Sequence, residues 1–309
     1  MSIATPTLVT LRANFRLRLR DYSELVKARV TTLIVMTAWC GFYLGARKSG
    51  VPSISWTMMH ALAGIALVAG GTAALNEVME RDLDRLMRRT AIRPLVTGRM
   101  GLAHGLCIGV ALVLGGSLYM WLTTSWLAAA LTFATSVTYL AAYTPLKRVH
   151  PICTFVGAFP GAMPPLLGWA AVRRVEWEAL LLFGIVFCWQ FPHFHSIAWL
   201  YREDYERAGI RMLPVADGDG RSTAREIVLY LGALLLMTVA VYVLGIAGRA
   251  YLVAALVLGA AFFVVGWQLA MSKLTPQDAR SKHLARRVLQ ASVIYLPLLF
   301  AMMMIDARL

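Results

Sequence analysis

The sequence predicts an all-α protein that crosses a membrane many times. Three observations support this fold class: 59% of the 309 residues are hydrophobic, only 15% are charged, and the mean hydropathy is +0.65. A soluble globular domain needs a polar exterior, so one soluble core cannot bury this much apolar surface. We therefore expect a polytopic membrane protein.

Nine apolar stretches are long enough, or nearly so, to cross a hydrocarbon core about 30 Å thick at about 1.5 Å per residue. In chain order they lie near residues 27–46, 57–75, 102–122, 125–143, 152–172, 179–200, 227–246, 250–270 and 289–305. The polar segments between them are too short to form a soluble domain. We expect a basic cytoplasmic tail at 1–26, one nine-helix membrane domain at 27–305 and a short C-terminal tail at 306–309.

The basic residues delimit these stretches and predict their orientation, because cytoplasmic loops of membrane proteins are enriched in Lys and Arg. With the N-terminus inside, the five inner segments hold 24 of the 30 basic residues. These inner residues run from Arg12 to Arg29, from Arg81 to Arg99, over Lys147 and Arg148, from Arg202 to Arg225 and from Lys273 to Arg287. This distribution predicts an odd number of spans and a cytoplasmic N-terminus.

The formal net charge of +14 belongs to this cytoplasmic rim, where anionic lipid is the expected partner and nucleic acid is not. The basic start of the chain also has the composition of an organellar targeting peptide, but it is short. We therefore expect the inner (plasma) membrane of a bacterium rather than the mitochondrial inner membrane. The four cysteines show no CxxC spacing, which argues against a metal site or a disulfide framework.

Polar residues gather where the second apolar stretch ends, in the segment NEVMERDLD at 76–84. At about 100° per residue, Asn76, Glu80 and Asp84 share one helical stripe, with Glu77 at its edge. Hard oxygen ligands at this spacing suit Mg²⁺, which binds one or two carboxylates together with phosphate oxygens. The alternative is a solvated helix end with surface ion pairs. Carboxylates beside hydrocarbon are costly, which favours the functional interpretation.

Basic residues near this segment match an anionic substrate. Arg88, Arg89 and Arg93 would supply fork-shaped donors to a diphosphate. Lys147 and Arg148, after the fourth stretch, would either bind the same diphosphate or only anchor the chain's orientation.

NEVMERDLD resembles the NxxxDxxxD motif of the UbiA superfamily of intramembrane prenyltransferases, with Glu80 at a position that usually holds Asp. Four further segments are similar to the protohaem IX farnesyltransferase (haem O synthase) family within it: RRTAIRPLVTG at 88–98, YTPLKR at 143–148, WQFPHF at 189–194 and REDYERAGIRMLPV at 202–215. The resemblance implies nine helices bundled around a central cavity, where farnesyl diphosphate and haem b react with Mg²⁺ to give haem O and diphosphate. It also implies contact with haem A synthase or cytochrome oxidase assembly proteins.

The superfamily has a second acidic motif, DxxxD, after the sixth span, and this sequence departs from it. Leu200 stands four residues before Asp204, and Glu203 precedes Asp204 directly. The resemblance therefore assigns a second metal site to Glu203, Asp204 or both. The alternative is a solvated face on which Glu203 and Glu206 pair with neighbouring arginines.

The sixth stretch contains the candidate for haem recognition. An imidazole in hydrocarbon needs a partner, and a haem iron would provide one for His193, as would a hydrogen bond to a neighbouring helix. His195 lies about 200° further around the helix and cannot face the same cavity. Four aromatic residues are candidates to stabilise an allylic cation, or are packing residues: Tyr143, Trp169, Trp189 and Phe191.

Three other functions remain open at this stage. A related prenyltransferase would act on a quinone precursor such as 4-hydroxybenzoate, a transporter would use broken helices as its substrate site, and a non-catalytic protein would handle haem. Prolines at 160, 164 and 165, together with the glycines beside them, predict that the fifth stretch is a bent and closely packed cavity wall. The similar segments AIRPLVTG at 91–98 and GIRMLPVADG at 209–218 hint at an internal repeat.

Overall fold

The computed structural model of the protein describes residues 8–309, with side chains from residue 17 onward, and in this part of the chain it contains helices and no strand. The helices are α1 (Leu8–Leu25), α2 (Ala28–Lys48), α3 (Trp56–Met79), α4 (Arg81–Leu86), α5 (Pro94–Thr97), α6 (Leu102–Thr123), α7 (Trp126–Thr138), the π-helix η1 (Tyr139–Tyr143), α8 (Thr144–Leu146), α9 (Cys153–Ala170), α10 (Trp177–Leu200), α11 (Arg202–Arg207), α12 (Leu213–Ala216), α13 (Arg221–Val243), α14 (Arg249–Met271) and α15 (Ala279–Ile305). The first seven residues of the predicted tail, and the side chains of Arg12 and Arg16, lie outside this description.

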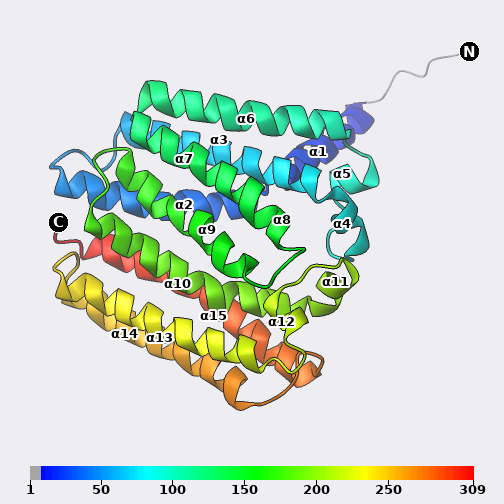
Figure 1. Cartoon of the computed structure of the whole chain (residues 1–309). Helices are drawn as coiled ribbons and strands as arrows, with labels where there is room; N and C mark the ends of the chain where they lie inside the picture. Colours follow the sequence, from blue (N-terminus) through cyan, green and yellow to red (C-terminus); the bar gives the residue numbers. More distant parts are fainter. Residues whose placement is uncertain (1–7) are drawn as a thin grey trace, which may run out of the picture.

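Nine long helical segments lie side by side in one bundle (Figure 1). They are α2, α3, α6, the continuous α7–η1–α8 segment, α9, α10, α13, α14 and α15, and each corresponds to one predicted stretch. Eight of them are long and apolar enough to cross a membrane. The ninth, α9, is 18 residues long and contains three prolines, which lower its hydropathy. The prediction of an all-α polytopic membrane protein is confirmed, while the boundaries of the predicted domain stay a prediction.

Two predicted boundaries were wrong by more than a helical turn. α13 begins at Arg221 rather than near 227, and α15 begins at Ala279 rather than near 289. In both cases the helix continues past the apolar stretch as charged turns. A hydropathy criterion excludes such turns, although water satisfies their side chains without ending the helix.

Four short helices and α1 gather at one end of the bundle. α1, α4, α5, α11 and α12 lie at this end, and the C-terminus lies at the opposite end (Figure 1). The chain thus crosses the bundle an odd number of times between α1 and its C-terminus. The end that carries the short helices also carries the predicted acidic segments, so the polar chemistry belongs to one end.

α9 packs against α2 on one side and α10 on the other. A Cβ atom at Gly168 would come within 1.9 Å of the carbonyl oxygen of Ala38, so only glycine allows α2 this close. Similarly, a Cβ atom at Gly161 would overlap the side-chain oxygen of Gln190 in α10, at 2.0 Å. Pro160, Gly161 and Pro164 line the cavity described below. The prediction that this helix is a closely packed cavity wall is confirmed.

Candidate active site

A cavity of about 480 Å³ extends into the bundle from the end that carries the short helices. Its wall is formed by residues of α2, α3, α7, η1, α9 and α10, with Leu296 of α15 and residues of the loops that contain α4 and α11. Val30 and Leu33 of α2 line the cavity and are nevertheless 52% and 44% exposed. The cavity therefore also opens sideways, toward the surface that the lipid would cover.

The three residues of the first acidic motif converge on this cavity. α3 ends at Met79 and α4 begins at Arg81, so the helix breaks at Glu80 and the three residues do not share one continuous stripe. Asn76, Glu80 and Asp84 still line the cavity, and each is buried, at 1%, 7% and 1% exposure. Asp82 lies on the exposed side of α4. Buried oxygen ligands at the edge of an apolar cavity are the arrangement that the sequence motif predicts.

Each of these three side chains is paired with a cation from a different part of the chain. Lys27 Nζ donates to Asn76 Oδ1 at 3.0 Å, and Lys147 Nζ donates to Glu80 Oε1 at 2.8 Å. Arg93 forms an ion pair with Asp84. Two carboxylates thus face three cations, so this end of the cavity carries a net positive charge. Such a site attracts a polyanion.

Lys27 is the residue of this cluster that the sequence did not predict. It lies between α1 and α2 with a left-handed backbone, at φ 47°, a conformation that is costly for a residue with a side chain and is enriched at functional sites. Burial, together with the positive charges of Arg93 and Lys147, lowers the pKa of Lys27 to about 8. The only signal in the sequence was a basic residue at the start of the first apolar stretch.

The environment of Asp84 also favours the binding of a cation. Burial raises the pKa of this carboxyl group, although the guanidinium group of Arg93 opposes the shift. Carboxylates that need a cation and cations that need an anion lie side by side, so the site is suited to a metal ion together with an anionic ligand.

The donor set fits Mg²⁺. Asn76 Nδ2 donates to Thr144 Oγ1 at 3.2 Å, which directs the amide oxygen toward Lys27 and the cavity. One amide oxygen and two carboxylates are hard ligands that leave positions for phosphate oxygens. No cluster of three His, Cys, Asp or Glu side chains occurs in the described part of the chain, so these residues alone do not form a closed metal cage.

The acids of the second acidic segment do not line the cavity, although residues beside them do. Asp204 is 9% exposed and its Oδ2 accepts from the backbone N–H of Arg89 at 3.4 Å, while Oδ1 pairs with Arg207. Arg89 lines the cavity, as does Tyr205. Glu203 has a 56% exposed side chain and pairs with Lys282 at 2.6 Å, outside the cavity wall. Asp204 therefore holds the loop of Arg89, and Glu203 lies at the surface.

The predicted diphosphate-binding residues separate into two groups. Arg93 and Lys147 line the cavity, together with Arg89. Arg88 and Arg148 are both exposed, and neither forms part of the cavity wall.

Aromatic residues line the cavity beside this charged cluster. Of the four candidates, Tyr143 and Trp189 belong to the wall, whereas Trp169 and Phe191 are packed inside the bundle. Tyr139, which was not among the predicted residues, also lines the cavity and lies four residues before Tyr143. Both tyrosines belong to the π-helix η1, a rare element that is frequent at functional sites.

His193 lines the deeper part of the cavity. Its Nδ1 lies 2.8 Å from Ser292 Oγ of α15, and its ring stacks on Trp189 with the ring centroids 4.6 Å apart. His195 is fully buried on another side of α10, where its Nε2 lies 2.8 Å from Glu226 Oε2. The two histidines therefore face different surroundings, and only His193 reaches the cavity.

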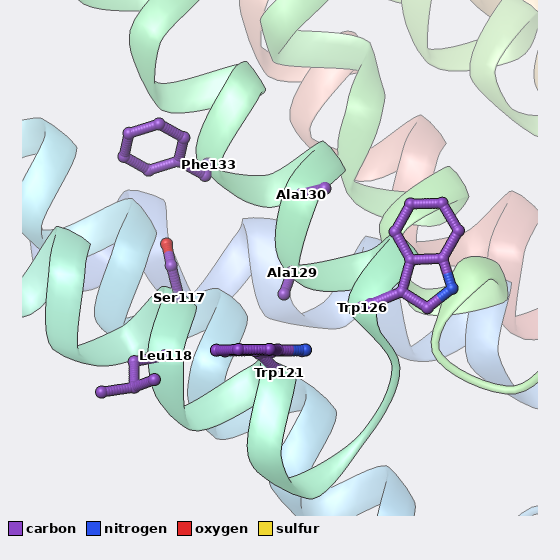
Figure 2. Close-up of a pocket in the computed structure, with 7 residues that line it drawn as sticks. All are labelled: Ser117, Leu118, Trp121, Trp126, Ala129, Ala130 and Phe133. Carbon is purple, nitrogen blue, oxygen red and sulfur yellow. The ribbon is translucent and has the colours of Figure 1, made fainter.

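A second hollow lies on the outer surface between α6 and α7 (Figure 2). Its volume is about 370 Å³, and it is lined by Ser117, Leu118, Trp121, Trp126, Ala129, Ala130 and Phe133. None of these side chains is ionisable, so this hollow offers no acid–base group.

The chain is similar to a family model and to proteins of known family. Residues 34–290 match the model of the UbiA prenyltransferase family. The chain is 61% identical over 307 residues to a protein of Koribacter versatilis (strain Ellin345) named protoheme IX farnesyltransferase, and the match covers 99% of each chain.

Two solved structures share the fold at low identity. A structure of digeranylgeranylglyceryl phosphate synthase is similar with a TM-score of 0.74 and 16% identity, over 93% of this chain and 98% of the other. A UbiA homolog from Archaeoglobus fulgidus, bound to GPP and Mg²⁺, is similar with a TM-score of 0.62 and 16% identity, over 92% and 99%. Since the family model spans most of its length, the chain belongs to the UbiA prenyltransferase family.

Proposed function

We propose that the protein transfers the farnesyl group of farnesyl diphosphate to the terminal carbon of a vinyl group of haem b, while a water molecule adds a hydroxyl group to the other vinyl carbon, giving haem O and diphosphate. The observation that carries this proposal is the buried cluster of Asn76, Glu80 and Asp84, paired with three cations at the edge of an apolar cavity. The choice of haem as acceptor is supported by the 61% identical relative, whose name specifies protohaem IX.

Asn76, Glu80 and Asp84 would hold Mg²⁺, and the Archaeoglobus homolog bound to GPP and Mg²⁺ supports this metal. When bound, Mg²⁺ neutralises diphosphate charge and stabilises diphosphate as a leaving group. Lys27, Arg93 and Lys147 bind the diphosphate oxygens once Asn76, Asp84 and Glu80, with which they pair, bind the metal ion instead. The same contacts thus hold the site together before substrate binds, and their cations bind the anion afterwards.

The rest of the cavity protects the reacting carbon. As the C1–O bond of farnesyl diphosphate breaks, positive charge develops on an allylic carbon, and water must not reach that carbon prematurely. The cavity wall is mainly apolar, although several hydroxyl side chains and Gln190 also line it, and the rings of Tyr143 and Trp189 offer their faces to a cation. Lys147 already lies over the Tyr143 ring, 4.5 Å from its centroid, so that face is suited to positive charge.

The remaining assignments follow from the predicted topology. We propose that the end with the short helices faces the cytoplasm of a bacterial cell and that the protein lies in the inner membrane. The basic residues at that end and the bacterial source of the relatives support this orientation. Contact with haem A synthase or cytochrome oxidase assembly proteins belongs to the same proposal.

Incubation of the purified protein with farnesyl diphosphate, Mg²⁺ and ferrous haem b tests this function. We expect the farnesylhydroxyethyl derivative of haem by mass spectrometry, and a complete absence of this adduct would refute the proposal. A competition with 4-hydroxybenzoate distinguishes the quinone alternative, because a quinone-forming enzyme would prenylate that acceptor instead.

A further inference from the structure

The environment of His193 contains a positioning residue on another helix. Ser292 lies in α15, about a hundred residues further along the chain, and is completely buried. It contacts two neighbouring side chains of α10. Its Oγ lies 2.8 Å from His193 Nδ1, and its carbonyl oxygen accepts from Trp189 Nε1 at 2.8 Å.

The hydrogen bonds of Ser292 determine which nitrogen of His193 carries the proton. A serine hydroxyl has one hydrogen, and Ser292 Oγ donates it to the carbonyl oxygen of Leu289 at 2.6 Å. Toward His193 the hydroxyl can then only accept, so Nδ1 must be the protonated nitrogen. The opposite assignment would leave two oxygens 2.6 Å apart with no hydrogen between them.

This tautomer leaves Nε2 of the neutral imidazole with a free lone pair. Among the side chains described, those of residues 17–309, Nε2 of His193 has no hydrogen-bond partner, and it is not a buried unpaired atom. His193 lines the cavity, and stacking on Trp189 fixes the plane of its ring. A histidine that binds a metal typically donates its other N–H to an oxygen in this way.

We propose that Ser292 is a positioning residue for the acceptor substrate: it holds His193 in the Nδ1–H tautomer, and His193 Nε2 then binds the haem iron. This inference rests on the proposed function, because it takes haem as the acceptor. It also assigns α15 a role in substrate recognition, since the carbonyl oxygen of the same residue holds Trp189. His193 lies about 10 Å along α10 from its end at Leu200, so the iron would lie deeper in the bundle than the diphosphate.

Haem binding by the purified full-length protein and its variants tests this inference. Titrations with haem and with metal-free protoporphyrin IX are compared for the wild type, Ser292→Ala, Ser292→Thr and His193→Ala. Loss of an oxygen that orients a metal-binding histidine typically weakens metal affinity about 10- to 100-fold. We expect Ser292→Ala to weaken haem binding by this factor, and Ser292→Thr, which keeps the hydroxyl, to restore it. Binding of the iron-free porphyrin should stay unchanged.

Resonance Raman spectra of the ferrous complexes give a second readout. We expect an iron–histidine stretch in the wild type, a lower frequency in Ser292→Ala and no such band in His193→Ala. Equal haem affinity in the wild type and Ser292→Ala, or equal losses for haem and iron-free porphyrin, would overturn the inference. So would unchanged haem ligation in His193→Ala.

The adduct assay separates this inference from the proposed function. A wild-type protein that binds haem through His193 but forms no farnesyl adduct would refute the proposed reaction alone. A protein that forms the adduct while Ser292→Ala binds haem normally would refute the role of Ser292 alone.

Discussion

Two carboxylates only a few residues apart, Asp82 and Asp84, have opposite surroundings. Asp84 is 1% exposed and pairs with Arg93, whereas Asp82 is exposed. They look alike in the sequence, and the turn of α4 alone separates them. This contrast provides a matched control for the proposed metal site.

Glu80→Gln and Asp84→Asn should each lower turnover at least about 100-fold, because an amide keeps the shape of the side chain but loses the charge that would hold Mg²⁺. Asp82→Asn should retain near wild-type turnover. Adduct formation per mole of purified protein measures the effect, with the yield of folded protein as the control. Full activity in both Glu80→Gln and Asp84→Asn would reduce these acids to structural ion pairs.

Lys147 and Arg148 give a second matched pair at the residue scale. Lys147 lines the cavity and binds Glu80, while Arg148 lies outside the wall. Lys147→Gln should lower kcat/KM for farnesyl diphosphate about 100-fold, because it removes a charged donor to the diphosphate. Arg148→Gln should have an effect of only a few-fold. Steady-state kinetics measures both, and a larger effect at Arg148 would contradict the assignment.

At the scale of elements, two parts of the fold repeat. The six-residue helix α4 is followed by α5, and the six-residue helix α11 is followed by α12. Pro94 and Pro214 each occupy one of the first two positions of the second helix. The predicted similarity of the segments at 91–98 and 209–218 thus has a structural counterpart, although only the first repeat places its acids in the cavity wall.

The close contact between α2 and α9 leads to an expectation about stability. Gly168→Ala should destabilise the protein by about 1–3 kcal/mol, because the new Cβ would overlap the backbone of α2. Gly115→Ala in α6 is the control, since no atom lies within 4 Å of the added Cβ and alanine favours a helix. Apparent melting temperatures in detergent measure both. Equal or higher stability of Gly168→Ala would show that the helices have room to separate.

On the scale of the whole molecule, charge and chemistry are segregated between the two ends. The end with the short helices carries the acidic motifs and most of the basic residues, and the cavity extends from it into the bundle. The end of the cavity near the short helices is therefore suited to ionic ligands, and its deeper part is suited to apolar and planar ligands.

Accessibility labelling tests the proposed orientation. Cysteines at the exposed positions Thr97 and Arg174 lie in an inner and an outer segment, respectively. If the basic end faces the cytoplasm, as we propose, a membrane-impermeant maleimide should label Thr97→Cys only in inverted vesicles and Arg174→Cys only in right-side-out vesicles. The wild type, which keeps its four native cysteines, gives the background. The reverse pattern would refute a cytoplasmic N-terminus.

The separation between the two halves of the cavity predicts a selective effect of metal removal. Chelation of Mg²⁺ should abolish turnover, because diphosphate departure loses its charge neutralisation. Haem affinity should stay within about two-fold, because His193 and Ser292 do not belong to the acid cluster. Turnover assays and haem titrations with and without chelator measure the two effects. A parallel loss of both would indicate a single coupled site.

The sequence by itself determined the fold class, and it located the nine long helical segments and the acidic motif that lines the cavity. These properties depend on hydropathy, on charge asymmetry and on residues close together in the chain, all of which are local. Asn76, Glu80 and Asp84 could therefore be predicted together, as could Arg93 and Lys147.

The tertiary structure decided which side chains meet in the cavity, because these contacts join residues far apart in the sequence. It brought Lys27 to Asn76 and Ser292 to His193, and it left Arg88, Arg148 and Glu203 outside the cavity wall. The tertiary structure also decided where helices begin, since water and neighbouring helices allow α13 and α15 to extend beyond their apolar stretches. The physical reason is that a local pattern fixes which face of a helix is polar, whereas helix packing fixes what that face meets.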